Sequence, residues 1–503
     1  MLSKTILLPV TCLALIGIIC WSCSEDRLDL DPGSLTEASF FQNEVEFERA
    51  ITGVYAKLTD IYWFNANNPM HGFWQLPGDD VTTIGQSPYE VFVTLNPGSQ
   101  FIGRYYQQNF QLVNRANTVL EKIAEEEGVY TTPGLKEEHR AQALFFRSWA
   151  FFQLWNYYGT APVITQRIGL ADEDIVIFQA SSRGVELLDQ AIIDLESIVG
   201  LLPTEWPDNQ RGRVTNNSVH ALLAKALISR AAWTNNQNDY QSAIDAIDQI
   251  TGRSLVTNFA DNFDATTENN AESLFEFQAS QPATDNVWLP NDFEQGGVGS
   301  TSAYWGYYEN HFSLFGTPPF IATEKLIAAF DPADPRLPLT ANPDDRAFTK
   351  YVLGDQKANT GVGSLNNPRL MRYADILLLK AEAIVESSGD LSEAVDLVNA
   401  VRTRARGMDS LGLTPANYEF TGESSDEVRA WIQNERLLEL AGEGGIRWQD
   451  LRRWHQIGHI NLASFDFSSD REDFGIEIPK NLVYPIPLGE LDINPNATQN
   501  PGY

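Results

Sequence analysis

The chain has 503 residues, 43% of them hydrophobic and 11% aromatic, which is enough to bury a large core in one domain or two interlocked ones. Its formal net charge of −32 argues against nucleic acids and anionic lipid surfaces as partners. The composition therefore predicts an acidic, folded globular body.

Residues 1–22 have the pattern of a bacterial lipoprotein signal peptide. Lys4 precedes an apolar run, Ile6–Ile19, that is short for a transmembrane span, and a small serine stands before Cys23. We expect cleavage before Cys23 and lipid attachment to that residue. Cys20 is a competing attachment point, and an ordinary secretory signal is the alternative. No cysteine follows Cys23, so packing rather than disulfides must hold the exported protein together.

Apolar residues recur at helical spacing in several segments of the region 23–253. The predicted helices are 44–58, 104–126, 136–158, 183–202, 217–233 and 240–250. The helices 136–158 and 183–202 form one candidate hairpin of tetratricopeptide size, the next two helices form another, and 104–126 could start a further pair. The rings expected in the core of this region are Phe145, Trp149, Phe152 and Trp155.

The helical pattern lapses in the region 254–368, where Pro, Gly, Asn and Asp are frequent. Only Phe320–Phe330 is expected to be helical there, and Phe275–Phe277 is expected to form a short strand. So long an irregular stretch within a compact domain indicates a functional insert.

The region 369–503 begins with the clearest hairpin in the chain, Arg369–Arg406. We expect Gly389 to end its first helix in the left-handed conformation, and Asp390 with Glu393 to cap the second. The sequence thus predicts a mostly α fold, in which a tetratricopeptide-like scaffold of helical hairpins carries a large loop-rich ligand-binding region.

Two motifs of this hairpin, R-Y-A-D-I-L-L-L-K-A-E-A at 372–383 and A-V-D-L-V-N-A-V-R-T-R-A at 394–405, closely resemble the carboxy-terminal signature of SusD/RagB-like proteins. Residues 28–58 resemble the opening of that family. The closing segment 484–503, Y-P-I-P-L-G-E-L-D-I-N-P-N-A-T-Q-N-P-G-Y, is the most specific match. The resemblance covers nearly all of the mature chain and is weakest between 260 and 368.

The resemblance implies a nutrient-binding lipoprotein of the Bacteroidetes outer membrane, with an oligo- or polysaccharide as ligand. It also implies a SusC-like, TonB-dependent β-barrel transporter as partner, which the protein serves as substrate receptor and lid. Ser24, Glu25 and Asp26 resemble the acidic tether that sends such lipoproteins to the cell exterior. The alternatives are a glycoside hydrolase on a helical fold and a peptide- or protein-binding repeat scaffold.

Glu435, Glu439 and Glu443 are spaced four residues apart, and a pair of carboxylates is what a glycoside hydrolase needs. Such a pair normally faces across a cleft, whereas these three would run along one helix face. We therefore interpret them as a structural ion-pair cluster, offset by Arg436 and Arg447.

No other catalytic, metal or cofactor signature is present. The sequence has no H-E-x-x-H, no G-x-S-x-G and no phosphate-binding loop. His455 and His459 could share a helix face, but two ligands do not make a zinc site, and we expect exposed polar histidines. The acidic composition is compatible with calcium, but no EF-hand spacing supports it. We predict no enzyme activity, no metal and no cofactor.

Two aromatic segments are the best candidates for a ligand site. One spans residues 62–75. The other spans 288–320 and has nine aromatic residues among 33. Sugar rings stack on Trp and Tyr, while amides bind their hydroxyl groups. The expected ligand contacts are Trp63, Trp74, Trp288, Trp305, Tyr307 and Tyr308, with Asn67, Asn291 and Gln295 as hydroxyl partners. For any single ring, burial in the core is the alternative.

Overall fold

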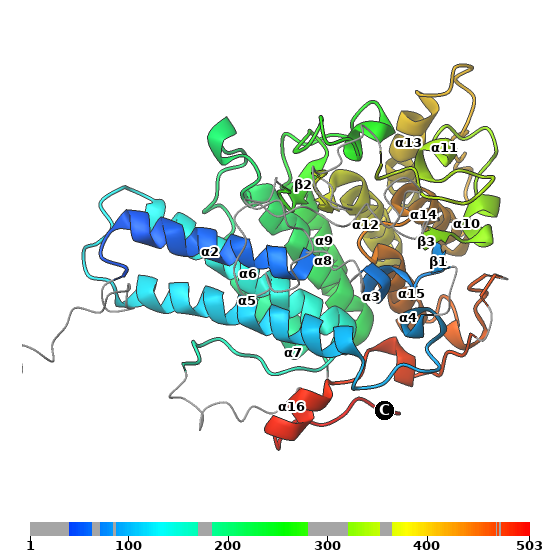
Figure 1. Cartoon of the computed structure of the whole chain (residues 1–503). Coiled ribbons are helices and arrows are strands. Elements are labelled where there is room, and N and C mark those ends of the chain that lie inside the picture. The colour runs from blue at the N-terminus through cyan, green and yellow to red at the C-terminus, as the bar shows by residue number, and fades with distance from the viewer. Residues whose placement is uncertain are drawn as a thin grey trace, which may run out of the picture.

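The computed structural model describes residues 40–62, 71–83, 87–169, 184–279, 320–352, 365–468, 470–471 and 474–503 (Figure 1). The longer helices are α2 (Glu44–Tyr62), α5 (Gln100–Glu125), α6 (Leu135–Tyr158), α7 (Glu186–Glu196), α8 (Asn216–Thr234), α9 (Gln237–Asp248), α12 (Tyr373–Glu386), α13 (Leu391–Arg406), α14 (Ser425–Leu440) and α15 (Ile446–Gln456). The short helices are α3 (His71–Gln75), α4 (Pro88–Val91), α10 (Glu324–Ala329), α11 (Leu337–Thr340) and α16 (Leu488–Ile493). The predicted mostly α fold is confirmed.

The helices stack as successive hairpins. The predicted pairs α6/α7, α8/α9 and α12/α13 each pack together, and contacts of α7 with α8 and of α9 with α12 join them into one array. Helix α5 packs against both α2 and α6, so it does belong to a further pair, and these three helices run side by side at one end of the molecule (Figure 1). Helix α7 is shorter than the predicted 183–202: it ends at Glu196, and the turn that follows includes Gly200 in the left-handed conformation (φ 79°).

Helix α6 is buried along most of its length. Every residue from Ala141 to Tyr158 is buried, including the four rings predicted to be core residues. Because no side of this part of the helix is exposed to solvent, other elements must pack around it. Helices α2, α5, α7 and α8 provide that surrounding, and one continuous hydrophobic core extends from α2 to the carboxy-terminal segment.

The turn between α12 and α13 differs from the prediction in detail. Ser388, and not Gly389, takes the left-handed conformation (φ 60°). Asp390 caps α13 by accepting the N–H of Ser392 at 2.9 Å, while Glu393 forms an ion pair with a lysine of α12 at 3.0 Å. The polar tip of the turn tolerates a serine where glycine would be the usual choice.

Two small antiparallel sheets attach the described part of the region 254–368 to the helices. Strand β1 (Val81–Thr83) pairs with β3 (Phe320–Ala322), and β2 (Ser273–Glu276) pairs with β4 (Arg369–Arg372). The strand expected at 275–277 is confirmed for Phe275 and Glu276, whereas Phe277 follows the end of β2. The helix expected over 320–330 is wrong at its start, because pairing with β1 overrides the local periodicity and α10 begins only at Glu324.

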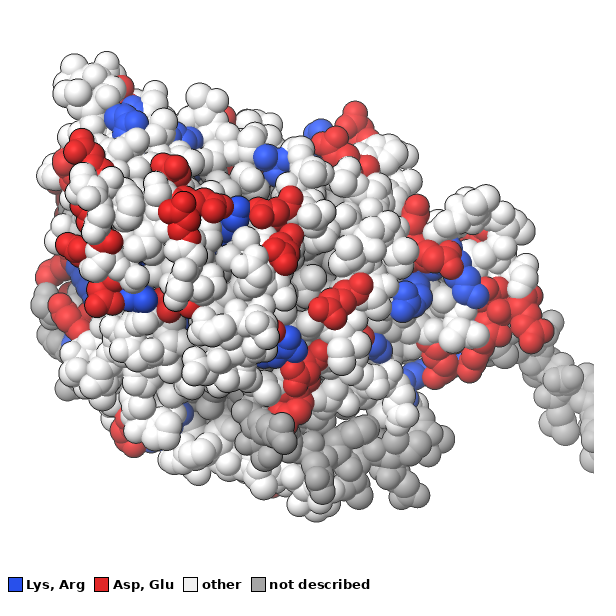
Figure 2. All heavy atoms as spheres, turned by 180° about the vertical axis from the view of Figure 1, so that it is seen from behind, with Lys and Arg blue, Asp and Glu red and all other residues white. Residues whose placement is uncertain are grey.

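The surface is acidic without a continuous basic area on the face shown in Figure 2, where Lys and Arg are scattered between Asp and Glu. None of the described helices is long and apolar enough to cross a membrane.

Candidate ligand-binding site

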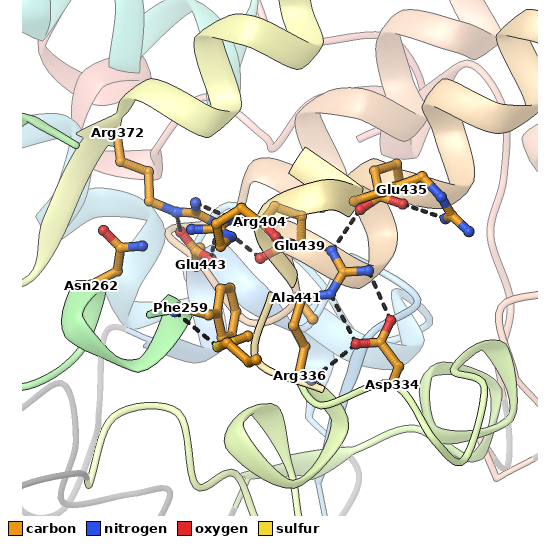
Figure 3. Close-up of polar contacts among 12 residues, drawn as sticks. Phe259, Asn262, Asp334, Arg336, Arg372, Arg404, Glu435, Glu439, Ala441 and Glu443 are labelled. Atoms are coloured by element: carbon orange, nitrogen blue, oxygen red, sulfur yellow. Dashed lines mark hydrogen bonds and ion pairs between the residues drawn. The ribbon is translucent and has the colours of Figure 1, made fainter. Parts of the chain in front are cut away.

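The three glutamates of the candidate carboxylate cluster are buried and bound to arginines (Figure 3). Glu435 and Glu439 both accept hydrogen bonds from Arg336, at 2.5 and 3.0 Å. Arg372 donates to Glu439 at 2.7 Å and to Glu443 through two nitrogens, at 2.7 and 2.8 Å. Each carboxylate is thus occupied by a guanidinium group, which confirms the interpretation as an ion-pair cluster.

The partners of this cluster are not the predicted ones. Arg436 binds Asp375 and Asp450, and Arg447 binds Asp79. Neighbouring positions on a helix point in different directions, so Arg436 cannot reach the face of Glu435. The cations come instead from β4, from α13 and from the segment before α11, all distant in sequence.

Glu439 is poorly suited to catalysis. Burial by itself would raise its pKa, but the guanidinium groups of Arg404, Arg372 and Arg336 outweigh burial and hold the pKa well below its ordinary value. A general acid needs a pKa near the working pH, so a carboxylate held ionised in this way cannot donate a proton near neutrality.

These ion pairs predict a loss of stability in acid. Glu439 and Asp375 have folded-state pKa values below the ordinary 4.5 and 3.8, because opposite charges outweigh burial. As the pH falls below about 4.5, the unfolded chain binds protons that these folded carboxylates still exclude, so the free energy of unfolding decreases. Burial raises the pKa of Asp80 to about 6. Between pH 6 and 3.8 the folded chain therefore binds a proton that the unfolded chain does not, so this one group increases the free energy of unfolding as the pH falls.

Urea unfolding at a series of pH values checks this expectation. We expect the free energy of unfolding to decrease steadily once the pH is below about 4.5. A constant value down to about pH 3 would contradict the assignment of these carboxylates as ionised and paired.

A small cavity of about 40 Å³ lies among α3, α5, α6, α8, β4 and the start of α15. Its lining is rich in rings and amides. The lining residues are Trp74, Tyr105, Trp149, Phe152, Gln153, Tyr157, Lys225, Pro368, Arg369, Leu370, Gly444, Ile446 and Gln449. We call it the aromatic cavity.

A glycine turn closes one side of the aromatic cavity. Gly445 has φ 72°, and a Cβ placed on it would lie 2.7 Å from the carbonyl oxygen of Trp74 and 2.7 Å from the hydroxyl of Tyr157. Only glycine permits this close approach in this conformation. The start of the turn is held in place because Arg372 and Lys350 both donate hydrogen bonds to the carboxylate of Glu443. The Lys350 Nζ lies 2.5 Å from Glu443 Oε1.

Of the predicted ligand contacts, the structure describes Trp74, which is 4% exposed, lines the aromatic cavity and packs against Tyr105 with ring centres 5.8 Å apart. Its role as a ligand contact stays a prediction. The other predicted contacts lie outside the described residues, as does Cys23; they are Trp63, Asn67, Trp288, Asn291, Gln295, Trp305, Tyr307 and Tyr308.

The described ends of both aromatic segments meet near this cavity. Gly72 lies near the end of the first segment, and a Cβ on it would lie 3.8 Å from the ring of Phe320, the last residue of the second. At the other end, Ala279 donates its N–H to Asn367 at 2.7 Å, and Phe277 donates its N–H to the carbonyl of Pro368, a lining residue, at 3.0 Å. The end of the first segment and the described residues on both sides of the second therefore lie close to the aromatic cavity.

Sequence reasoning assigned Trp149 and Phe152 to the core alone, and it did not single out Lys225. These residues are buried, as expected, but they also line the cavity. Only the density of rings along 145–158 could have drawn attention to them, and that density is equally typical of a packed core.

The two histidines are partly buried rather than exposed. His459 Nε2 lies 2.9 Å from a carboxylate oxygen of Glu386, and His455 Nδ1 lies 3.2 Å from the carbonyl of Ile460. Within the described part of the chain, no group of three or more His, Cys, Asp or Glu is arranged to hold a metal ion.

Comparison with known proteins agrees with this architecture. Residues 331–503 match the model of the SusD family, and residues 37–228 match a model described as "Starch-binding associating with outer membrane". SusD-like protein P2 of Formosa agariphila is 25% identical over an alignment that covers 98% of each chain.

Two solved structures share the fold. A SusD homolog from Bacteroides thetaiotaomicron has a TM-score of 0.76 at 20% identity, covering 93% of this chain and 99% of its own. Surface glycan-binding protein A from the same species, in complex with laminarihexaose, has a TM-score of 0.72 at 21% identity, covering 91% and 99%. With two family models that together match well over half of its length, the chain belongs to the SusD/RagB family.

Proposed function

We propose that this protein is a glycan-binding lipoprotein on the exterior of the outer membrane, where it serves as substrate receptor and lid for a SusC-like, TonB-dependent transporter. The observation that carries the glycan-binding role is the aromatic cavity, beside which both aromatic segments begin or end. Family membership supports the association with the outer membrane. A relative of the same fold has been solved with laminarihexaose, which makes that oligosaccharide a suitable first probe.

The size of the cavity limits its part in binding. Pockets that enclose a whole small ligand measure about 300–1,000 Å³, whereas the aromatic cavity measures about 40 Å³. It therefore accommodates a substituent of a sugar and not a ring. The rings of a glycan would stack on the predicted Trp and Tyr side chains of the two aromatic segments.

The glycoside hydrolase alternative loses its main support, because the carboxylates that suggested it are buried and paired with arginines. A pure protein-binding scaffold would show no affinity for any glycan.

The site is tested with Trp288→Ala and Trp305→Ala. We expect each variant to weaken glycan binding by about 1–3 kcal/mol, by analogy with bases stacked on aromatic side chains, without lowering the melting temperature. Calorimetry with a bound glycan, paired with a melting curve, checks both. A ring that belongs to the core would instead cost about 3–5 kcal/mol of stability. Normal binding by both variants, or simple unfolding of both, would remove these rings from the site.

Anchoring is tested with Cys23→Ala. We expect the variant to lose its lipid and to leave the membrane fraction, because the acyl chains on Cys23 are its anchor. Even one acyl chain would hold a protein at the membrane only marginally, and the variant would have none. Fractionation and mass spectrometry of the amino terminus check this. Unchanged membrane association together with an unchanged amino-terminal mass would contradict the lipoprotein assignment.

A further inference from the structure

The charged groups that line the aromatic cavity are cationic. Lys225 and Arg369 line it, and no Asp or Glu is among its described lining residues. The chain as a whole has the opposite balance, with 67 acidic and 35 basic residues. A local reversal of sign in a cavity favours a ligand group of negative charge.

Two buried donors of this lining lack an acceptor. Trp149 is 3% exposed, and its Nε1 has no hydrogen-bond partner; the same holds for Nε of Arg369. The nearest carboxylate to Arg369 is Glu276, whose Oε1 lies 3.6 Å from that nitrogen, beyond hydrogen-bond distance. Buried donors in native proteins are nearly always paired, so these two call for an acceptor.

Lys225 provides a third incomplete donor. The residue is 8% exposed, and its Nζ donates to Asp375 at 2.5 Å. An ammonium group has three N–H donors, and among the described residues the Lys225 ammonium donates one of them to Asp375. Asp375 is shared with Arg436, which donates to its other oxygen at 2.8 Å. The lysine can therefore donate to a further acceptor without giving up its ion pair.

The cavity has the volume of a small acid group. A water molecule needs about 10–15 Å³ in the same measure, so a cavity of about 40 Å³ takes about three water-sized groups. A carboxylate has three heavy atoms and two acceptor oxygens, each able to accept more than one hydrogen bond. It matches both the size of the space and the donors around it.

We propose that the aromatic cavity receives the carboxylate of an acidic sugar, so that the ligand is a uronate-containing glycan. The inference rests on the proposed glycan-binding function and adds the ligand class. Lys225 supplies the charge, and Trp149 supplies a neutral donor from the same lining. A sulfate ester would offer the same acceptor chemistry on a larger group, and the experiment below distinguishes the two.

The test is calorimetry with the full mature chain. The ligands are oligogalacturonates and oligomannuronates, the same oligosaccharides with their carboxylates reduced to alcohols, a sulfated glucan, and neutral laminarihexaose. We expect a uronate chain to bind, and its carboxyl-reduced form to bind about tenfold to a hundredfold more weakly, as for the loss of a hydrogen bond to a charged group.

Three variants assign the effect to residues. Lys225→Met should weaken uronate binding about tenfold to a hundredfold, and Trp149→Phe, which keeps a ring but removes the N–H, roughly threefold to tenfold. Lys57→Met is the matched control: Lys57 is also a buried lysine bound to an aspartate, Asp60, at 2.5 Å, but it does not line the cavity. It should leave binding unchanged. If Lys225→Met does not fold, Trp149→Phe decides.

The outcomes separate the inference from the function on which it rests. Equal binding of uronate and carboxyl-reduced chains, unaffected by Lys225→Met and Trp149→Phe, overturns the inference and leaves glycan binding intact. Preference for the sulfated glucan overturns the carboxylate assignment. Absence of binding to every glycan in the series overturns both.

Discussion

Arg372→Met is expected to destabilise the protein by about 3–5 kcal/mol, the cost of removing one partner from a buried ion pair. The Arg372 side chain is 2% exposed and donates to Glu272, Glu439 and Glu443. Methionine fills much of the volume but leaves three buried carboxylates with fewer cations. The loss arises mainly from these uncompensated charges and not from the arginine itself.

The control for Arg372→Met is the same substitution at Arg211. That side chain is 59% exposed, and its partner Asp208 lies 3.6 Å away and is 97% exposed. Exposed pairs contribute about 0–1 kcal/mol, so Arg211→Met should change the urea midpoint little. A cost for Arg372→Met no greater than that for Arg211→Met would contradict the structural role of the cluster.

The buried cluster also has a consequence for the ligand site. Arg372 and Lys350 hold Glu443, which begins the glycine turn along the aromatic cavity. Loosening that anchor should disturb the cavity even where the variant remains folded. We therefore expect Arg372→Met to weaken glycan binding under conditions in which most of the protein is still native.

Gly445→Ala is expected to have the second large effect. Alanine at this position meets two costs: the left-handed conformation, about 1–2 kcal/mol, and a clash with the backbone of Trp74 and the hydroxyl of Tyr157, about 1–3 kcal/mol. The turn must shift away from α3, so the cavity changes shape. Both the melting temperature and glycan affinity should fall.

Gly444→Ala separates the two costs. Gly444 also has positive φ, 52°, but nothing lies within 4 Å of a Cβ placed on it. Its substitution should cost only the conformational part, about 1–2 kcal/mol. Equal effects of the two substitutions on melting temperature and on binding would show that the close approach of Gly445 to Trp74 is unimportant.

Local periodicity predicts most of the scaffold, because each helix of a hairpin must bury one apolar face against its neighbours. The stripes along α2, α5 and α9 show that periodicity, and the structure has helices there. Position Ser388 shows the limit of such rules, since a turn accepted serine where glycine was expected. The start of α10 shows another, because the pairing of β3 with β1 depends on residues distant in sequence.

The site is less predictable than the scaffold for the same reason. Arg336 and Arg372 reach the glutamates of α14 from about 100 and 70 residues away, which no local pattern encodes. Trp149 is a core ring by every local criterion, and only the assembled cavity shows that its N–H lacks an acceptor. Aromatic density, by contrast, did direct attention to Trp74, which lines that cavity, and to a second segment whose described neighbours lie close to it.

Hydrogen–deuterium exchange with and without a bound glycan tests most directly whether the ligand site lies at the aromatic cavity. The account predicts slower exchange in peptides that cover 71–76, 277–279 and 366–370, which surround the described ends of the aromatic segments. Exchange in α9, none of whose residues lines the cavity, should not change. Protection confined to other parts of the molecule, with these three peptides unaffected, would contradict the account.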